Sequence, residues 1–126
     1  MAINILNVDD SAVMRSMIKK TIDRCGVEVG EVYEAENGIE GIDQLNKNWL
    51  DLIFLDVNMP IMNGMEMLDI IRNNPETTDL PVLIVSTESN AQRIEIISNH
   101  NAGFVHKPFT PETLREKIMD VLGVLY

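Results

Sequence analysis

Five short apolar runs alternate with five amphipathic stretches in this chain, and this alternation restricts the fold more than any other feature. The apolar runs predict β-strands near residues 2–8, 31–35, 51–55, 81–85 and 103–106. The amphipathic stretches predict helices at about residues 12–25, 38–47, 64–73 and 90–99, and from Thr110 onward. Such alternation is typical of a parallel sheet with helices on both faces, joined by right-handed crossovers. We therefore predict one doubly wound α/β domain over residues 1–126.

Each predicted helix has an apolar stripe that we expect to face the sheet. In chain order the stripes consist of Met14, Met17, Ile18, Thr21, Ile22 and Cys25; Ile39, Ile42 and Leu45; Met65, Leu68 and Ile71; Ala91, Ile94 and Ile97; and Leu114, Ile118, Val121 and Leu122. Gly26 is expected to end the first helix, because glycine readily adopts the left-handed conformation found there. Thr110 as N-cap and Pro111 at the first helical position predict the start of the fifth helix.

Length and composition favour a single cytoplasmic domain. The 126 residues match the usual size of one domain, and 45% hydrophobic residues can supply its core. Cys25 is the only cysteine, which suits the reducing cytosol, and we expect it in the core. The first residues do not resemble a signal peptide, and no apolar run has the roughly 20 residues needed to cross a bilayer. The net charge of −10 argues against binding to nucleic acid, so we expect neither a nucleic-acid partner nor membrane insertion.

A carboxylate ends the most apolar strand of the chain. Leu52 to Leu55 read as a strand buried on both faces, and Asp56 follows them directly. A carboxylate in that place is costly unless it lies in a cleft, is paired with a charge or binds a cation. Asp56 is therefore either a functional carboxylate or the cap of a turn, and this stretch alone leaves both readings open.

Other strands end in residues of matching chemistry. The first strand is followed by Asp9 and Asp10, the fourth by Ser86, and the fifth by Lys107. Because parallel strands end at one edge of a sheet, these side chains are expected to gather around Asp56. Carboxylates that crowd together repel each other unless a cation lies between them, and an all-oxygen site suits Mg²⁺. We expect Asp56 to act as a nucleophile toward phosphorus, with Mg²⁺, Lys107 and the Ser86 hydroxyl at the phosphoryl oxygens.

Each of these residues also has an ordinary interpretation. Asp9, Asp10 and Ser11 suit any helix N-terminus, and Ser86 and Lys107 could be plain surface side chains. Their coincidence at four strand ends favours the functional reading. Other residues are expected to be structural: His100 and His106 have no metal-ligand spacing, and Met59, Met62 and Met65 could form walls of the site.

Several motifs, taken together and in order, resemble the receiver domain of two-component response regulators along essentially the full chain. The matching pieces are Val8-Asp9-Asp10-Ser11; Asp56 with Asn58-Met59-Pro60-Ile61-Met62-Asn63-Gly64; Ser86; and Lys107-Pro108-Phe109. The resemblance implies a flavodoxin-like (βα)5 domain with sheet order 2-1-3-4-5, which places the first and third strands side by side. Within the family the chain is similar to the stand-alone, CheY-like type of chemotaxis systems.

The resemblance also assigns roles by position. Asp56 stands at the phosphoacceptor position, Asp10 at the direct Mg²⁺ ligand, and Asp9 at an acid that acts through water. The backbone carbonyl of Asn58 stands at the third protein ligand of the metal. Ser86 and Lys107 match the hydroxyl and the lysine that contact the phosphoryl group. The bond between Lys107 and Pro108 is expected to be cis.

A conformational switch follows from the same resemblance. The phosphoryl group is expected to draw Ser86 inward, and Phe104 at the aromatic position turns into the space released. The face of the fourth helix, fifth strand and fifth helix would report this change to a partner. Phe104 lacks the hydroxyl of the usual tyrosine, and residues 98–103 look about one residue shorter than the usual turn, so the output face departs most from the family.

The implied function is signalling, with a sensor histidine kinase as phosphodonor and the flagellar motor switch as the downstream partner. Asn58 and Glu88 are expected to contact the water that hydrolyses the aspartyl-phosphate, which predicts dephosphorylation within seconds to minutes. Because the fifth helix ends the sequence, we expect a stand-alone protein. We also expect a monomer, and dimerisation on phosphorylation is left open. A phosphorelay intermediate or a phosphate sink is the alternative within the family.

Two readings from other classes compete with this one. A Mg²⁺-dependent phosphohydrolase that forms an aspartyl-phosphate usually has a second acid two residues after its nucleophile, where this chain has Asn58. A flavodoxin-like binder needs a phosphate-cradling loop after the first strand, where Asp9 and Asp10 would repel a phosphate. We therefore expect no enzyme activity beyond self-phosphorylation from small donors and self-dephosphorylation.

Overall fold

The computed structural model describes residues 2–87 and 90–123, and within them strands and helices alternate as predicted. The strands are β1 (Ile3–Val8), β2 (Val29–Ala35), β3 (Leu52–Leu55), β4 (Val82–Ser86) and β5 (Gly103–His106). The helices are α1 (Ala12–Arg24), α2 (Gly38–Lys47), α3 (Gly64–Asn73), α4 (Ala91–Asn99) and α5 (Pro111–Leu122). Every predicted element is present, and no end differs from its predicted position by more than two residues.

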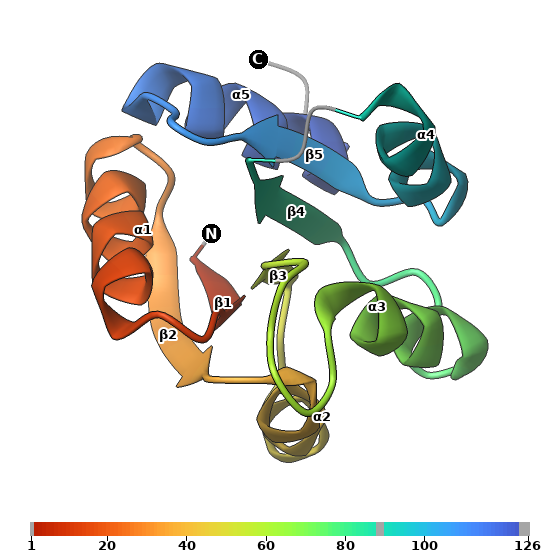
Figure 1. Cartoon of the computed structure of the whole chain (residues 1–126). Coiled ribbons are helices and arrows are strands. Elements are labelled where there is room, and N and C mark those ends of the chain that lie inside the picture. Colours follow the sequence, from red (N-terminus) through yellow and green to blue (C-terminus); the bar gives the residue numbers. More distant parts are fainter. Residues whose placement is uncertain (1, 88–89, 124–126) are drawn as a thin grey trace.

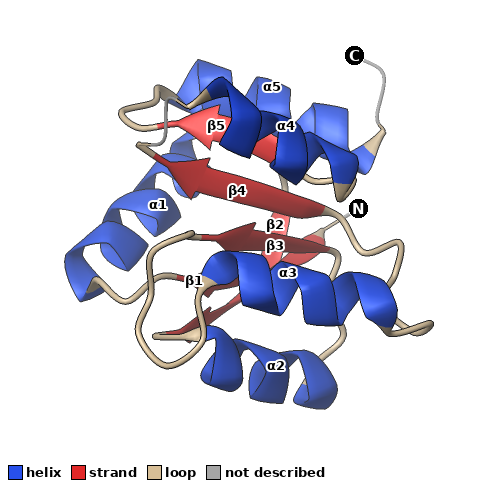
Figure 2. Cartoon of the chain, turned by 45° about the vertical axis from the view of Figure 1, so that its right-hand side comes forward, coloured by secondary structure: helices blue, strands red, loops and turns tan. Residues whose placement is uncertain are grey.

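The five strands form one parallel sheet in the order β2-β1-β3-β4-β5. Figure 2 shows the consequence for the strand ends, because the arrowheads of β3, β4 and β5 all point to the same side. The order of the strands and the (βα)5 pattern are those of the flavodoxin-like fold, as the resemblance implied.

Helices cover both faces of the sheet (Figure 1). On one face α1 and α5 enclose a core that includes Ile18, Phe54 and Ile118, and on the other face α2, α3 and α4 enclose a core that includes Leu68, Ile84 and Ile97. The central strands β3 and β4 are buried along their whole length. Helices cover both faces of the sheet at these strands, so neither face is exposed to solvent. This explains the continuous apolar runs in the sequences of β3 and β4.

The predicted helix ends are present in the structure. Thr110 caps α5 by accepting a hydrogen bond from the backbone N–H of Thr113, and Pro111 occupies the first turn. Gly26 follows α1 with a φ of +83°, the left-handed conformation that favours glycine. The peptide bond between Lys107 and Pro108 is cis, as expected.

Some predicted inward positions were wrong. Met17 is 55% exposed and Ile39 is 52% exposed, and Ala91 is also exposed. In α1 the buried positions are Arg15, Ile18 and Ile22, so the helix is rotated toward the arginine. In α2 the buried positions are Gly38 and Gly41, where an added Cβ would meet Met62 and Met67, and the helix face with these glycines packs inward in place of Ile39.

The other stripes are inward, with one addition. Cys25, Leu68, Ile71, Ile97, Leu114 and Ile118 are buried, as predicted. Met67 of α3 is also fully buried, although the predicted stripe did not include it. Trp49, after α2, is largely exposed.

Candidate functional site

Asp56 follows the last residue of β3 and lies at the edge where all the strands end. Its backbone N–H donates a hydrogen bond to the carbonyl of Val8, so Asp56 is fixed beside the end of β1. Val8 and Leu55 are partners in the sheet, and Asp9 and Asp56 are therefore the next residues on two adjacent strands. Parallel strands lie about 4.8 Å apart, which brings the two carboxylates together.

The environment of Asp56 disfavours its charge. The residue is only 9% exposed. Burial, and after it the nearby carboxylate of Asp9, raises the pKa of Asp56 from 3.8 to about 6, although Lys107 opposes this shift. At neutral pH Asp56 is mostly ionised, which is the form required of a nucleophile. The nearby positive charge of Lys107 does not fully offset the burial and the repulsion from Asp9.

Asp9 and Asp10 complete a cluster of three carboxylates. Oxygen atoms of Asp9, Asp10 and Asp56 lie within 4.8 Å of one another. Asp9 is 2% exposed, and its Oδ2 has no hydrogen-bond partner among the residues that the structure describes. Asp10 is the exposed member of the cluster.

This cluster fits a hard divalent cation. All of its donors are oxygen atoms, which suit Mg²⁺, and the buried Asp9 Oδ2 retains an unused acceptor. Three carboxylates at this distance repel one another, and a cation bound between them would remove that repulsion. Asp9, Asp10 and Asp56 could therefore hold a Mg²⁺ ion.

Lys107 supplies positive charge from the other side. The residue follows β5, and its backbone N–H donates to the carbonyl of Ser86. Its Nζ lies 3.6 Å from Oδ2 of Asp9 and 3.7 Å from Oδ1 of Asp56. One ammonium thus faces two carboxylates, and the cluster retains an excess of negative charge.

The remaining predicted site residues differ in their burial and in the elements that hold them. Ser86 is buried as the last residue of β4 and pairs with His106 of β5. Asn58 is exposed in the loop that follows Asp56. Phe104 is half-buried in β5, beside Ile84, and packs against the core on the α2, α3 and α4 face. Glu88 lies outside the described residues.

The residues expected to be structural behave accordingly. His106 is exposed, and Nδ1 of the half-buried His100 lies 2.8 Å from the carbonyl of Ile96. Met59 and Met65 help to line a cleft next to Asn58. Met62 instead lies against Gly38 of α2.

A glycine allows the loop after Asp56 to return close to the strand. Gly64 begins α3, and its N–H donates a hydrogen bond to the carbonyl of Val57 at 3.0 Å. A Cβ at this position would collide with the main-chain carbonyl oxygen of Asp56. Asn63 and Glu66 form a capping box that fixes the same turn.

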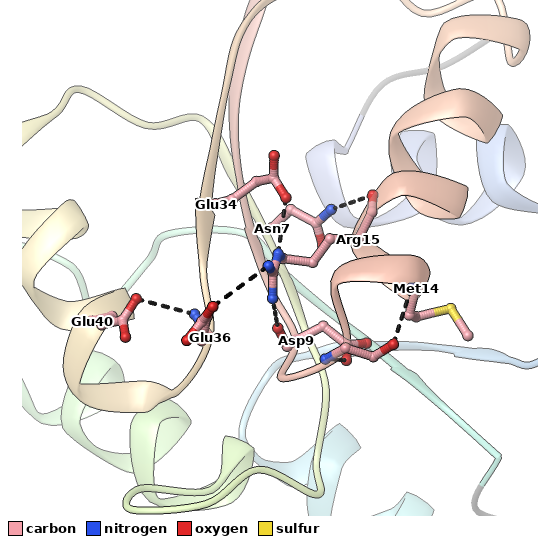
Figure 3. A network of polar contacts seen from close by, with 8 residues as sticks. Asn7, Asp9, Met14, Arg15, Glu34, Glu36 and Glu40 are labelled. Carbon is pink, nitrogen blue, oxygen red and sulfur yellow. Dashed lines mark hydrogen bonds and ion pairs between the residues drawn. The ribbon is translucent and has the colours of Figure 1, made fainter.

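Sequence reasoning missed Arg15, which contacts the main chain of Asp9. Its Nη1 donates a hydrogen bond of 2.6 Å to the main-chain oxygen of Asp9, and its Nε donates to Glu34 of β2 at 2.9 Å (Figure 3). The available signal was the spacing, because Arg15 shares a helix face with Ile18 and Ile22. A stripe that began at Arg15 would have predicted a buried arginine.

The described part of the chain has no helix with the length and apolar character needed to span a membrane.

Comparisons with known proteins agree with this geometry. The family model of the response regulator receiver domain matches residues 5–119. A chemotaxis protein CheY homolog of Campylobacter jejuni is 42% identical over 123 residues, which cover 94% of this chain and 92% of that protein. Chemotaxis protein CheY1 of Helicobacter pylori is 38% identical over 123 residues, covering 94% and 96%. The structure of chemotaxis response regulator CheY4 of Vibrio cholerae is similar with a TM-score of 0.83 at 33% identity, over 96% of this chain and 99% of that one. The chain therefore belongs to the response regulator receiver domain family.

Proposed function

We propose that this protein is a stand-alone response regulator that is switched by phosphorylation of Asp56. The observation that carries the proposal is the convergence of Asp9, Asp10 and Asp56 with Lys107 at one edge of the sheet. A buried carboxylate beside one ammonium, within a cluster of oxygen atoms that suits Mg²⁺, provides what phosphoryl transfer requires, namely a nucleophile and positive charge for the phosphoryl oxygens.

In the proposed reaction an oxygen of Asp56 attacks the phosphorus of a phosphohistidine on a sensor kinase. A new P–O bond forms, the P–N bond breaks, and its electron pair returns to the histidine. Lys107 lies where its ammonium can stay close to the transferred group, and the Ser86 hydroxyl donates a hydrogen bond to it. Mg²⁺ held by Asp9, Asp10, Asp56 and the Asn58 carbonyl would neutralise the phosphoryl oxygens.

The phosphoryl group adds a dianion to a site that is already negative, so the surrounding chain must respond to it. Ser86 and Phe104 lie on the adjacent strands β4 and β5, which connect the site to the face formed by α4, β5 and α5. We expect Ser86 to move inward and Phe104 to rotate, which changes that face for a partner.

The proposed role is chemotaxis signalling. The relatives from Campylobacter jejuni and Helicobacter pylori are named chemotaxis proteins. A flagellar motor switch protein is accordingly the proposed partner, and the cytoplasm, which suits the free and buried Cys25, is the proposed location.

The protein is proposed to act as a signal carrier and not as an enzyme on other substrates. Its own aspartyl-phosphate is expected to be hydrolysed within seconds to minutes, with Asn58 and Glu88 near the attacking water. Replacing Asn58 with alanine is expected to change that rate, and a phosphorylated half-life of many hours in the unaltered protein would contradict this part of the proposal.

Intact-mass spectrometry after incubation with acetyl phosphate tests the central claim. The expected result is one added phosphoryl group that requires Mg²⁺ and is absent from the Asp56→Asn variant. Acetyl phosphate donates the group as its P–O bond breaks and acetate leaves. No adduct under fast-quench conditions would mean that Asp56 is not a working phosphoacceptor.

A further inference from the structure

A buried arginine supports the carboxylate cluster without belonging to it. Arg15 is 9% exposed, and its guanidinium contacts oxygen atoms of Asp9, which follows β1, and of Glu34 and Glu36 at the end of β2. Its Nη1 donates to the main-chain carbonyl of Asp9 at 2.6 Å, its Nε donates to Oε1 of Glu34 at 2.9 Å, and its Nη2 lies 3.9 Å from Oε1 of Glu36 (Figure 3). The planar guanidinium thus makes three interactions in three directions, which fixes its orientation.

The same residue is connected to the turn that presents Asp9 and Asp10. The carbonyl of Arg15 accepts a hydrogen bond from Nδ2 of the fully buried Asn7, and its N–H donates to the carbonyl of Ser11. The N–H of Ser11 in turn donates to Oδ1 of Asp9 at 2.9 Å. These bonds hold the turn between β1 and α1 at both of its ends.

Asp9 is consequently fixed on every side except one. Its N–H donates to Ala35, its carbonyl accepts from Arg15, and its Oδ1 accepts from Ser11. Only Oδ2 has no hydrogen-bond partner among the described residues, and this atom faces Lys107 and the cluster. The interactions that Arg15 and Ser11 make with Asp9 therefore leave a single carboxylate oxygen directed at the cation site.

We infer that Arg15 is a positioning residue for the divalent cation, acting through the main chain of Asp9. This inference rests on the proposed function, because it concerns the same Mg²⁺ site. In this role, the hydrogen bond from Arg15 to the main chain of Asp9 keeps Asp9 and Asp10 in the position where their carboxylates lie close to Asp56. Glu34 and Glu36 keep the guanidinium in place. Groups that orient the ligands of a metal typically change its affinity by about 10- to 100-fold when they are removed.

The sign of the effect separates this role from a simple electrostatic one. A positive charge near the cluster repels Mg²⁺, so loss of the Arg15 charge alone would strengthen metal binding. Loss of its positioning bonds would weaken metal binding. A substitution that removes both the charge and the hydrogen bonds of Arg15 therefore shows whether repulsion or positioning has the larger effect on Mg²⁺ affinity.

The test is calorimetric titration of the full chain with MgCl₂ alone. We compare the unaltered protein with Arg15→Gln, Arg15→Lys and the control Arg24→Gln, which removes the same charge from an exposed position of α1. Thermal unfolding without Mg²⁺ checks that each variant folds. Arg15→Gln is expected to raise the Kd for Mg²⁺ by about 10- to 100-fold. Arg15→Lys, which keeps the charge and loses the planar fork, should fall between it and the unaltered protein, and Arg24→Gln should have no effect.

An unchanged or tighter Kd in folded Arg15→Gln would overturn the inference. If Arg15→Gln does not fold, Arg15→Lys decides, since an unchanged affinity in that folded variant contradicts a positioning role. These results are distinct from failure of the proposed function. Unaltered protein that binds no Mg²⁺ and forms no phosphoryl adduct would overturn both, whereas normal binding by every variant overturns only the role of Arg15.

Discussion

The ammonium of Lys107 lies 3.7 Å from the carboxylate of Asp56, although the two residues follow β5 and β3, which are separated in the sheet by β4. It also lies 3.6 Å from Asp9, so one positive charge is shared by two buried carboxylates. Asp10 adds a third carboxylate to this cluster, so the negative charge exceeds the positive charge of the one ammonium. The balance of charge in this site governs metal affinity, protonation and stability, and it leads to the first two predictions.

Lys107 is expected to compete with a bound cation. Replacing it with methionine removes that repulsion and should tighten Mg²⁺ binding by about tenfold, which corresponds to about 1.4 kcal/mol. The same change should strongly reduce the phosphoryl adduct from acetyl phosphate, because the transferred group loses a cation. Titration with MgCl₂ and intact-mass spectrometry measure the two effects, with Lys19→Met, an exposed lysine of α1, as the control. Weaker Mg²⁺ binding in Lys107→Met would contradict this account.

Ionised Asp56 should destabilise the fold at neutral pH. The pKa of Asp56 is about 6 in the folded protein, against an ordinary value of 3.8. Between these two pH values the folded state binds more protons than the unfolded state, so the free energy of unfolding falls as the pH rises. Without metal, Asp56→Asn should therefore be more stable than the unaltered protein at neutral pH, by up to about 3 kcal/mol. The advantage should vanish below about pH 4. Urea unfolding across this pH range checks the prediction, and equal stability of the two proteins at neutral pH would refute it.

Ile61 is a strained residue in the loop after Asp56. Its φ is +69°, and the N–H of Met62 donates to the carbonyl of Pro60, so Ile61 is the central residue of a tight γ-turn. A β-branched residue is unfavourable there, and the side chain is 79% exposed, so it gains little from packing. Ile61→Asn should raise the free energy of unfolding by about 1 kcal/mol.

The control for that change is Ile39→Asn, which replaces another exposed isoleucine in the ordinary backbone of α2. That variant should be slightly less stable than the unaltered protein, because asparagine is a poorer helix former in this position. A loss of stability in both variants would show that the turn at Ile61 carries no strain.

Gly64 is expected to tolerate no side chain. In Gly64→Ala the new Cβ collides with the main-chain oxygen of Asp56, and because neither backbone can move freely we expect a loss of more than about 2 kcal/mol. The matched control is Gly41→Ala. Its Cβ would meet side-chain atoms, namely the flexible end of Met67 and a methyl group of Val8, and no backbone atom is among these nearest contacts. Chemical unfolding compares the two variants, and a similar small effect of both would show that the loop adapts.

Arg72 fixes the turn between α4 and β5. Its guanidinium donates to the carbonyls of His100 and Asn101, and also to Thr78 and Leu80 in the segment before β4. Arg72→Gln should cost about 2–4 kcal/mol, because four carbonyls, two of them in part-buried hydrogen bonds, lose a charged donor together. Amide hydrogen exchange should rise in residues 98–102 more than elsewhere. The control is Arg24→Gln, which replaces an exposed arginine. If amide exchange in residues 98–102 is the same in both variants, Arg72 does not fix this turn.

The local patterns of the sequence were sufficient to predict the strands and helices. Strands and helices are encoded by short-range periodicity, and caps such as Thr110 and Gly26 are read from neighbouring residues. Helix faces were predicted less well. Met17 was expected inside and Arg15 was not considered, because an apolar pattern cannot recognise an arginine that is buried by hydrogen bonds with another strand.

What the sequence determined by itself was the order of the elements and the kind of residue at each strand end. Asp9, Asp10, Asp56, Ser86 and Lys107 each follow from a local boundary, and all lie at the carboxyl edge of the sheet. Which of them touch depends on the order β2-β1-β3-β4-β5, which is set by hydrogen bonds between residues far apart in the chain.

The adjacency of Asp9 and Asp56 was implied by the family resemblance and not by local patterns, and the structure confirms it. Only the tertiary structure decided that Lys107 lies close to both carboxylates and that Arg15 donates a hydrogen bond to the main chain of Asp9. These contacts arise from packing, where burial and charge are balanced over several elements at once, and short-range periodicity carries no information about them.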